Sequence, residues 1–144
     1  MHQPEENCHH KMLSFHSVDG KLVIGPSELY SLRDSVDICV LDVRETYLSY
    51  HKRMGLNNIM YIPLSELHEK HSLIQAGKLC ILVDAAGLRS KEAYLLLREL
   101  GYTQLAILGG GMIEWERAGL PVVTDRLEQL DGSCMCQLKG RSRD

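Results

Sequence analysis

The stretch of this sequence best suited to chemistry runs from Asp84 to Ser90, with the order Asp84-Ala85-Ala86-Gly87-Leu88-Arg89-Ser90. It follows a continuous apolar run over residues 78–83 and precedes a segment of helical periodicity over residues 90–100, which Ser90 is suited to cap. A tight strand-to-helix loop of small residues turns backbone N–H groups inward, and such groups at a helix N-terminus bind an anion. The alternative is a compact connection without a ligand. The Arg89 side chain either points into the loop or lies against the helix end, and both readings stay open.

Cysteines are the second chemically capable group, and the chain has five of them. Cys39 and Cys80 lie within apolar runs, where we expect each to be a small buried hydrophobic side chain. The odd number and these apolar settings argue against a secreted disulfide framework. We therefore expect a reducing, cytoplasmic environment.

Cys134 and Cys136 differ from the other cysteines because they lie one residue apart in a polar segment. Such a pair could accept sulfur, form a strained disulfide, or bind a metal together with Cys8, His9 and His10. We favour an inert tail over these three roles. The sequence thus predicts no metal site and no cofactor.

Strand and helix patterns alternate along the middle of the chain, which predicts a mostly parallel five-stranded sheet in an α/β fold. The strands are expected at 21–24, 37–43, 59–62, 78–83 and 105–108, and the helices from Pro26, at 64–71, 90–100 and 112–118. Ligands of such sheets bind beyond the C-terminal strand ends. Three loops lie there, after Val43, after Ile62 and after Val83.

Length and composition limit the classes of protein that this chain can be. Its 144 residues suit one domain, and 44% apolar residues exclude wholesale disorder. We expect a polar arm over 1–17, a globular domain over 18–125 and a tail over 126–144. A net charge of −3 argues against a nucleic-acid partner. No apolar run approaches the roughly 18 residues of a membrane span, and no signal peptide is visible, so we expect no membrane partner.

Four sequence blocks resemble the rhodanese-like domain family, and the resemblance covers nearly all of residues 20–122. In order, the blocks are Leu41-Asp42-Val43-Arg44-Glu45, Tyr61-Ile62-Pro63-Leu64, the loop 84–90, and Gly110-Gly111-Met112-Ile113-Glu114-Trp115 with Gly119-Leu120-Pro121-Val122. The resemblance implies a three-layer fold with helices on both faces of the sheet. It also implies that Asp42 and Arg44 are structural residues near the site.

At the loop, the chain differs from the active members of the family that it resembles. Their loop begins with a cysteine that carries sulfur as a persulfide, and this chain has Asp84 at that position. A carboxylate cannot become a persulfide, and it competes with anionic sulfur donors for the loop N–H groups. We expect the Asp84 side chain to face the N–H groups of residues 86–90 and to accept hydrogen bonds from them. Many active members have an arginine where this chain has Ala85. Related phosphatases need a cysteine, five residues and an arginine, whereas only four residues separate Asp84 from Arg89.

We therefore expect a catalytically degenerate domain that acts as a binding or regulatory module, without sulfur transfer through loop 84–90. Its partner would be a protein, or a small anion at the loop. The alternative is a sulfurtransferase or sulfur carrier that uses Cys134 and Cys136. A third possibility is that the chain is a structural subunit of a fixed oligomer, such as a homodimer.

Overall fold

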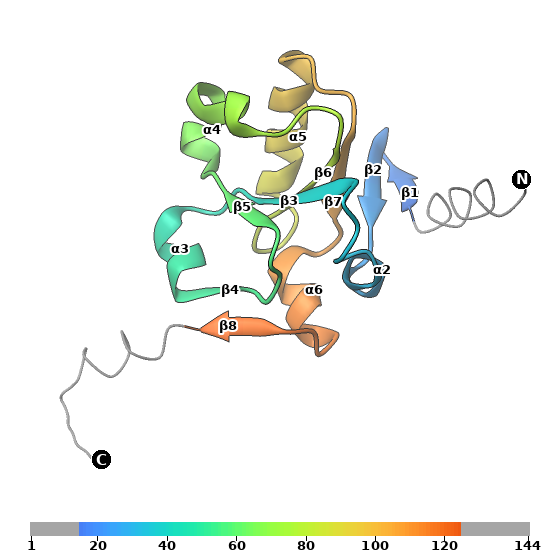
Figure 1. The fold of residues 1–144 in the computed structure, drawn as a ribbon, viewed down its shortest axis with the longest axis vertical. Helices are drawn as coiled ribbons and strands as arrows, with labels where there is room; N and C mark the ends of the chain where they lie inside the picture. Colours follow the sequence, from blue (N-terminus) through green and yellow to red (C-terminus); the bar gives the residue numbers. More distant parts are fainter. Residues whose placement is uncertain (1–14, 125–144) are drawn as a thin grey trace, which may run out of the picture.

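The computed structural model describes residues 15–124, and these residues are built around a six-stranded sheet with strand order β1-β2-β7-β6-β3-β5 (Figure 1). The strands are β1 (Phe15–Val18), β2 (Lys21–Ile24), β7 (Leu105–Leu108), β6 (Leu79–Val83), β3 (Ile38–Asp42) and β5 (Ile59–Tyr61). A separate small sheet pairs β4 (Lys52–Met54) with β8 (Val122–Thr124) in antiparallel fashion.

Five of the six strands, β2, β7, β6, β3 and β5, run parallel, as the sequence predicts. Strand β3 pairs with β5 on one side and with β6 on the other, and β6 pairs with β7. Their continuous apolar runs suit a sheet that is covered on both faces. Residues Val40, Leu41, Ile81 and Leu82 have no exposed side-chain surface. Because these strands are parallel, the segments after β3, β5 and β6 all leave the same edge of the sheet.

The first strand corrects the prediction of five strands and of a polar arm over 1–17. Strand β1 begins at Phe15 and pairs antiparallel with β2. The two strands are joined by Asp19 and Gly20, whose φ angles are 53° and 77°. Two positive φ angles are typical of the tight hairpin turn that an Asp-Gly pair favours. The fold thus begins before residue 18, while residues 1–14 lie outside the described residues.

Helices cover both faces of the sheet, which confirms the three-layer arrangement. The helices are α2 (Pro26–Ser31), α3 (Thr46–His51), α4 (Leu64–Lys70), the 3₁₀ turn η1 (His71–Leu73), α5 (Arg89–Glu99) and α6 (Gly111–Arg117). Figure 1 shows α2 and α6 close together and away from α4 and α5. Within residues 15–124, no helix is both long and apolar enough to cross a membrane.

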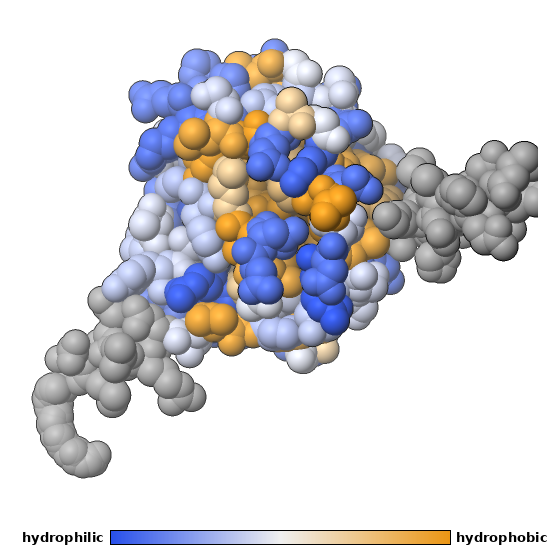
Figure 2. Space-filling model, in the orientation of Figure 1, coloured by the Kyte–Doolittle hydropathy of each residue, from blue (hydrophilic) through white to orange (hydrophobic). Residues whose placement is uncertain are grey.

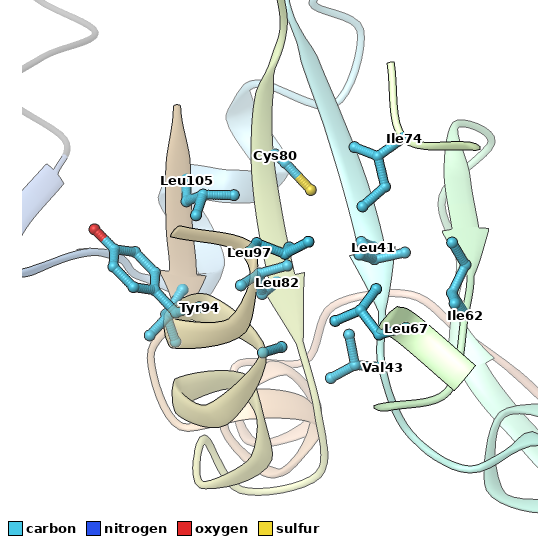
Figure 3. Close-up of a cluster of buried hydrophobic side chains, with 12 residues drawn as sticks. Leu41, Val43, Ile62, Leu67, Ile74, Cys80, Leu82, Tyr94, Leu97 and Leu105 are labelled. Carbon is cyan, nitrogen blue, oxygen red and sulfur yellow. The ribbon is translucent and has the colours of Figure 1, made fainter. Parts of the chain in front are cut away.

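Two apolar clusters hold these layers together, one on each face. On one face, Leu67 of α4 and Leu97 of α5 pack on Leu41 and Leu82 of the sheet (Figure 3). On the other face, Leu29 of α2 and Trp115 of α6 pack on Val40, Ile81 and other residues of that cluster. The Trp115 indole N–H donates to the Pro121 carbonyl at 2.7 Å, which ties the end of the domain to α6.

Candidate functional site

Loop 84–88 connects the buried strand β6 to α5 at the C-terminal edge of the sheet. It packs against the start of α6, where the Met112 N–H donates to the Asp84 carbonyl at 2.8 Å and the Ile113 N–H donates to the Ala85 carbonyl at 3.1 Å. A Cβ atom on Gly111, which has a φ of +61°, would collide with the Asp84 carbonyl oxygen. Glycine is therefore required at position 111 for this close approach between the loop and α6.

The Asp84 carboxylate faces into its own loop, as the sequence predicts. The Gly87 N–H donates to Oδ1 at 2.5 Å, and the Arg89 and Ser90 N–H groups donate to Oδ2 at 2.6 and 3.3 Å. The side chain is only 2% exposed. Gly87 has a φ of +95°, a left-handed conformation that turns the backbone around the carboxylate. The loop N–H groups thus form an anion site that the chain's own carboxylate occupies.

The start of α5 corrects the expected role of Ser90 as a helix cap. The helix begins at Arg89, its N-cap residue is Leu88, and no side-chain hydrogen bond caps it. Ser90 is buried, and its hydroxyl has no hydrogen-bond partner among residues 15–124. The Asp84 carboxylate accepts the N–H groups of the first turn instead. The Asp84 carboxylate therefore caps α5 from the end of the preceding strand. Its negative charge also interacts favourably with the dipole of the helix at this end.

The Arg89 side chain lies beside Glu45 of the neighbouring segment. Its guanidinium lies 3.7 Å from the Glu45 carboxylate, and 58% of the side chain is exposed. Glu45 is the N-cap residue of α3, so this weak ion pair brings the start of α3 beside loop 84–88. Sequence reasoning did not single out Glu45, because nothing local to residues 44–46 indicates which loop will lie next to it.

Asp42 and Arg44 form a buried ion pair at the end of β3. The guanidinium donates to both carboxylate oxygens, at 2.8 to 3.2 Å, and the two side chains are 0% and 6% exposed. Arg44 also donates to the Lys52 carbonyl at 2.7 Å. These contacts tie β3 to the start of β4, which agrees with a structural role beside the site.

Exposed apolar side chains lie on loop 84–88 and on the two helices beside it, α6 and α3. Leu88 is 70% exposed at the tip of the loop. Ile113, whose N–H contacts the loop, is 50% exposed, and Tyr47 on the neighbouring helix α3 is 67% exposed. On the face drawn in Figure 2, hydrophobic surface is divided by hydrophilic side chains and forms no single broad patch.

The tail cysteines, Cys134 and Cys136, lie outside the described residues, as do Cys8, His9 and His10. Among residues 15–124, no group of three or more His, Cys, Asp or Glu side chains is arranged to hold a metal ion. Cys80 is buried, as predicted, with 1% of its surface exposed. Cys39 is only partly buried, which corrects its assignment as a fully enclosed hydrophobic residue.

Comparisons with known proteins agree with this fold. A family model described as Rhodanese-like domain matches residues 25–118. A sulfurtransferase of Allochromatium vinosum is 29% identical over 92 residues, which are 64% of this chain and 84% of that protein. An uncharacterized protein of Synechocystis sp. is 30% identical over 109 residues, which are 74% of this chain but only 59% of the relative's length.

Among solved structures, the rhodanese-related protein of Thermoplasma volcanium is similar to this chain. It is 32% identical, and the match has a TM-score of 0.63 and covers 72% of this chain and 98% of that chain. The family model alone covers well over half of the residues. The chain therefore belongs to the rhodanese-like domain family.

Proposed function

We propose that this chain is a catalytically degenerate rhodanese-like domain that acts as a binding or regulatory module, with a protein partner at the mouth of loop 84–90. The observation that carries the proposal is that the Asp84 carboxylate accepts the three N–H groups of Gly87, Arg89 and Ser90. In active relatives the residue at the start of this loop is a cysteine that takes up sulfur. Asp84 stands at the corresponding position of the sequence pattern.

Two properties of Asp84 support the loss of sulfur transfer through this loop. A carboxylate oxygen cannot hold sulfane sulfur as a persulfide, so the covalent step has no acceptor. The same carboxylate already accepts the hydrogen bonds of the Gly87 and Arg89 N–H groups, which would otherwise stabilise an anionic sulfur species. Ala85 adds no cationic side chain, and the Arg89 guanidinium is directed towards Glu45. An anionic donor would therefore find no nucleophile in the loop and no unoccupied N–H groups of Gly87 and Arg89.

A protein partner fits the surroundings of the loop better than a small anion does. A small anion would have to displace a buried carboxylate from its hydrogen bonds. The exposed side chains of Leu88, Ile113 and Tyr47 instead offer separate apolar contacts around the loop. Exposed large apolar side chains beside a surface loop are suited to contact with a protein partner.

Sulfur transfer by Cys134 and Cys136 is the second candidate, and the sulfurtransferase of Allochromatium vinosum is the observation that favours it. A degenerate loop predicts no sulfur transfer in the wild type, whereas the second candidate predicts sulfur transfer that needs Cys134 and Cys136. Release of thiocyanate from thiosulfate and cyanide should be measured for the wild type, for Asp84→Cys, for Asp84→Asn and for Cys134→Ser/Cys136→Ser. We expect the wild type, Asp84→Asn and the tail variant to stay at the blank rate.

The Asp84→Cys variant should gain measurable activity. Its thiol would face the N–H groups of the first turn of α5, which lower the pKa of a thiol. Activity in the wild type that is lost on mutation of Cys134 and Cys136 would establish the tail as the sulfur-carrying site and refute the degenerate reading. A persulfide on Asp84→Cys, detected by mass spectrometry, would show that only the nucleophile is missing from the loop.

The partner site has its own test, which uses the exposed apolar side chains. Leu88→Asp should abolish association with a protein that co-purifies with the full chain. Leu73→Asp is the matched control, because Leu73 is 61% exposed but lies in η1 rather than at the loop. Equal loss of binding in both variants, or in neither, would contradict a partner site at the loop.

A further inference from the structure

Cys39 and Cys80 lie directly opposite each other on the neighbouring parallel strands β3 and β6. Both belong to the apolar cluster on the face that α4 and α5 cover, so their side chains leave the sheet on the same side. Figure 3 shows the Cys80 sulfur pointing from β6 towards β3. Both thiols are free in this structure.

The backbone geometry of this pair suits a disulfide. Neighbouring strands lie about 4.8 Å apart, and disulfides join Cα atoms that are about 4.4 to 6.8 Å apart. Residues that are register partners on adjacent strands meet this condition without a shift of either strand. The bond would cross-link the two central strands at the edge of the sheet opposite to loop 84–88.

The two thiols differ in their access to solvent. Cys80 is 1% exposed. Cys39 is partly buried and lines an open cavity of about 460 Å³, which Arg33, Asp34, Met60 and Lys78 also line. A small reagent that enters this cavity can therefore reach Cys39 but not Cys80. This asymmetry of one accessible thiol beside one enclosed thiol is typical of a pair in which the first reacts and the second resolves.

We propose that Cys39 is an oxidation site, that hydroperoxides are its oxidants, and that Cys80 resolves the oxidised form into a Cys39–Cys80 disulfide. In the first step the Cys39 thiolate attacks the peroxide O–O bond, takes one oxygen to become a sulfenic acid, and releases water or an alcohol after protonation. In the second step the Cys80 sulfur attacks the Cys39 sulfur, the S–S bond forms as the S–O bond breaks, and the hydroxyl leaves as water with the proton of the Cys80 thiol. The two thiols lose two electrons, which reduce the O–O bond.

The charges around Cys39 favour the thiolate that the first step needs. A hydrogen bond from the Cys80 thiol is the largest cause that lowers the pKa of Cys39, and the Lys78 ammonium lowers it further, while burial opposes both. Arg33 and Asp34 also line the cavity and are its other charged groups. The same interaction, together with burial and the charge of Cys39, raises the pKa of Cys80, so Cys80 keeps its proton as long as Cys39 is the thiolate.

Peptide mapping of the full chain tests this proposal directly, because trypsin separates the cysteines. Cleavage after Arg33 and Arg44 releases residues 34–44 with Cys39, and cleavage after Lys78 and Arg89 releases residues 79–89 with Cys80. The reduced protein is treated with hydrogen peroxide under native conditions, blocked with an alkylating reagent, digested and analysed by mass spectrometry. We expect peptides 34–44 and 79–89 joined, with a loss of two hydrogen atoms.

Three variants separate the steps. Cys80→Ala should leave a sulfenic acid on Cys39 that dimedone traps, and Cys39→Ser should leave Cys80 unmodified in the folded protein. The Cys134→Ser/Cys136→Ser variant should form the same cross-linked peptide as the wild type. Reduction with dithiothreitol should release the two peptides in the wild type and in the Cys134→Ser/Cys136→Ser variant.

Several outcomes would overturn the proposal. Oxidation of the tail cysteines while peptide 34–44 stays unmodified in the native wild type would show that Cys39 is not reactive. A sulfenic acid on Cys39 without the cross-link in the wild type would remove Cys80 from the chemistry. Formation of the cross-link only in urea would show that the pair reacts after unfolding, when the strand register no longer matters.

Discussion

Replacement of Asp84 by alanine tests whether this carboxylate holds the loop together. The substitution removes the acceptor of three backbone N–H groups, two of which are buried. The two bonds of 2.5 and 2.6 Å dominate, because the bond to the Ser90 N–H, at 3.3 Å, is weak. Alanine leaves these donors without a partner, except where water can enter from the exposed side of the loop.

The structure sets the size of the expected effect. A hydrogen bond to a charged group contributes about 1.5–3 kcal/mol, and an unsatisfied buried donor costs about 1–3 kcal/mol. Water can reach the partly buried Arg89 N–H, so the loss should be about 3–5 kcal/mol in the free energy of unfolding. At about 4 °C per kcal/mol, the melting temperature should fall by about 12–20 °C.

An added anion should recover part of this loss. Alanine empties the anion site, so sulfate at 100 times its Kd would restore about 2.7 kcal/mol, or about 10 °C. Thermal unfolding should be followed by circular dichroism in chloride and in sulfate at equal ionic strength, for the wild type, Asp84→Ala and Asp34→Ala. Asp34 is an exposed carboxylate, so its removal corrects for net charge and for the general stabilising effect of sulfate.

A melting temperature of Asp84→Ala within about 3 °C of that of Asp34→Ala in chloride would show that the loop N–H groups do not need the carboxylate. An equal rise in the melting temperature of all three proteins in sulfate is the second contrary result. That result would mean that the emptied loop is not an anion site. The degenerate reading of the loop would then lose its physical basis.

Three further predictions concern the surroundings of the site and the thiol pair. Asp42→Ala should lower the free energy of unfolding in urea by about 3–5 kcal/mol, because it leaves the Arg44 guanidinium buried without its counter-charge. Gly111→Ala should be about 2 kcal/mol more destabilising than Gly101→Ala, since both positions have positive φ but only Gly111 contacts loop backbone. Alkylation of Cys39 should rise with pH through a midpoint of about 7 and then level off, because only the thiolate reacts.

Each of these has a defined contrary result. If Asp42→Ala/Arg44→Met is no more stable than Asp42→Ala, the uncompensated guanidinium is not the cause of the loss. If Gly101→Ala and Gly111→Ala cost the same, backbone strain alone accounts for both. In Cys80→Ala the midpoint for Cys39 alkylation should move up, towards or above the ordinary thiol value of about 8.5, and an unchanged midpoint would refute the role of the Cys80 hydrogen bond.

The sequence by itself determined the central architecture, because the relevant signals are local. Continuous apolar runs such as 78–83 require burial on both faces, and that requirement predicts parallel strands beneath helices. The small residues after β6 likewise predict a tight loop at the start of a helix. The first N–H groups of a helix have no acceptor within it, so the sequence also predicts that the Asp84 carboxylate turns inward to accept them. The helix cap was assigned to the wrong residue, since Asp84 and Ser90 both offer an oxygen within six positions of each other.

Strand β1 shows where a local signal was present but outweighed. Its two middle residues, His16 and Ser17, are polar and exposed, as an edge strand allows, and the polar residues before it favour an arm over 1–17. The Asp19-Gly20 pair is nevertheless a strong hairpin signal. Strands β4 and β8 carry no comparable signal, because each has three residues and its partner is distant in the chain.

Only the tertiary structure decided which segments meet across long stretches of chain. Strand β6 lies between β7 and β3, and this order, which no local pattern specifies, makes Cys39 and Cys80 neighbours. The same holds for Glu45 beside Arg89 and for Gly111 beside the Asp84 carbonyl. A residue's own conformational preference and burial depend on its near neighbours in sequence. Pairing between distant segments depends instead on how all the apolar faces are buried together, which only the complete fold satisfies.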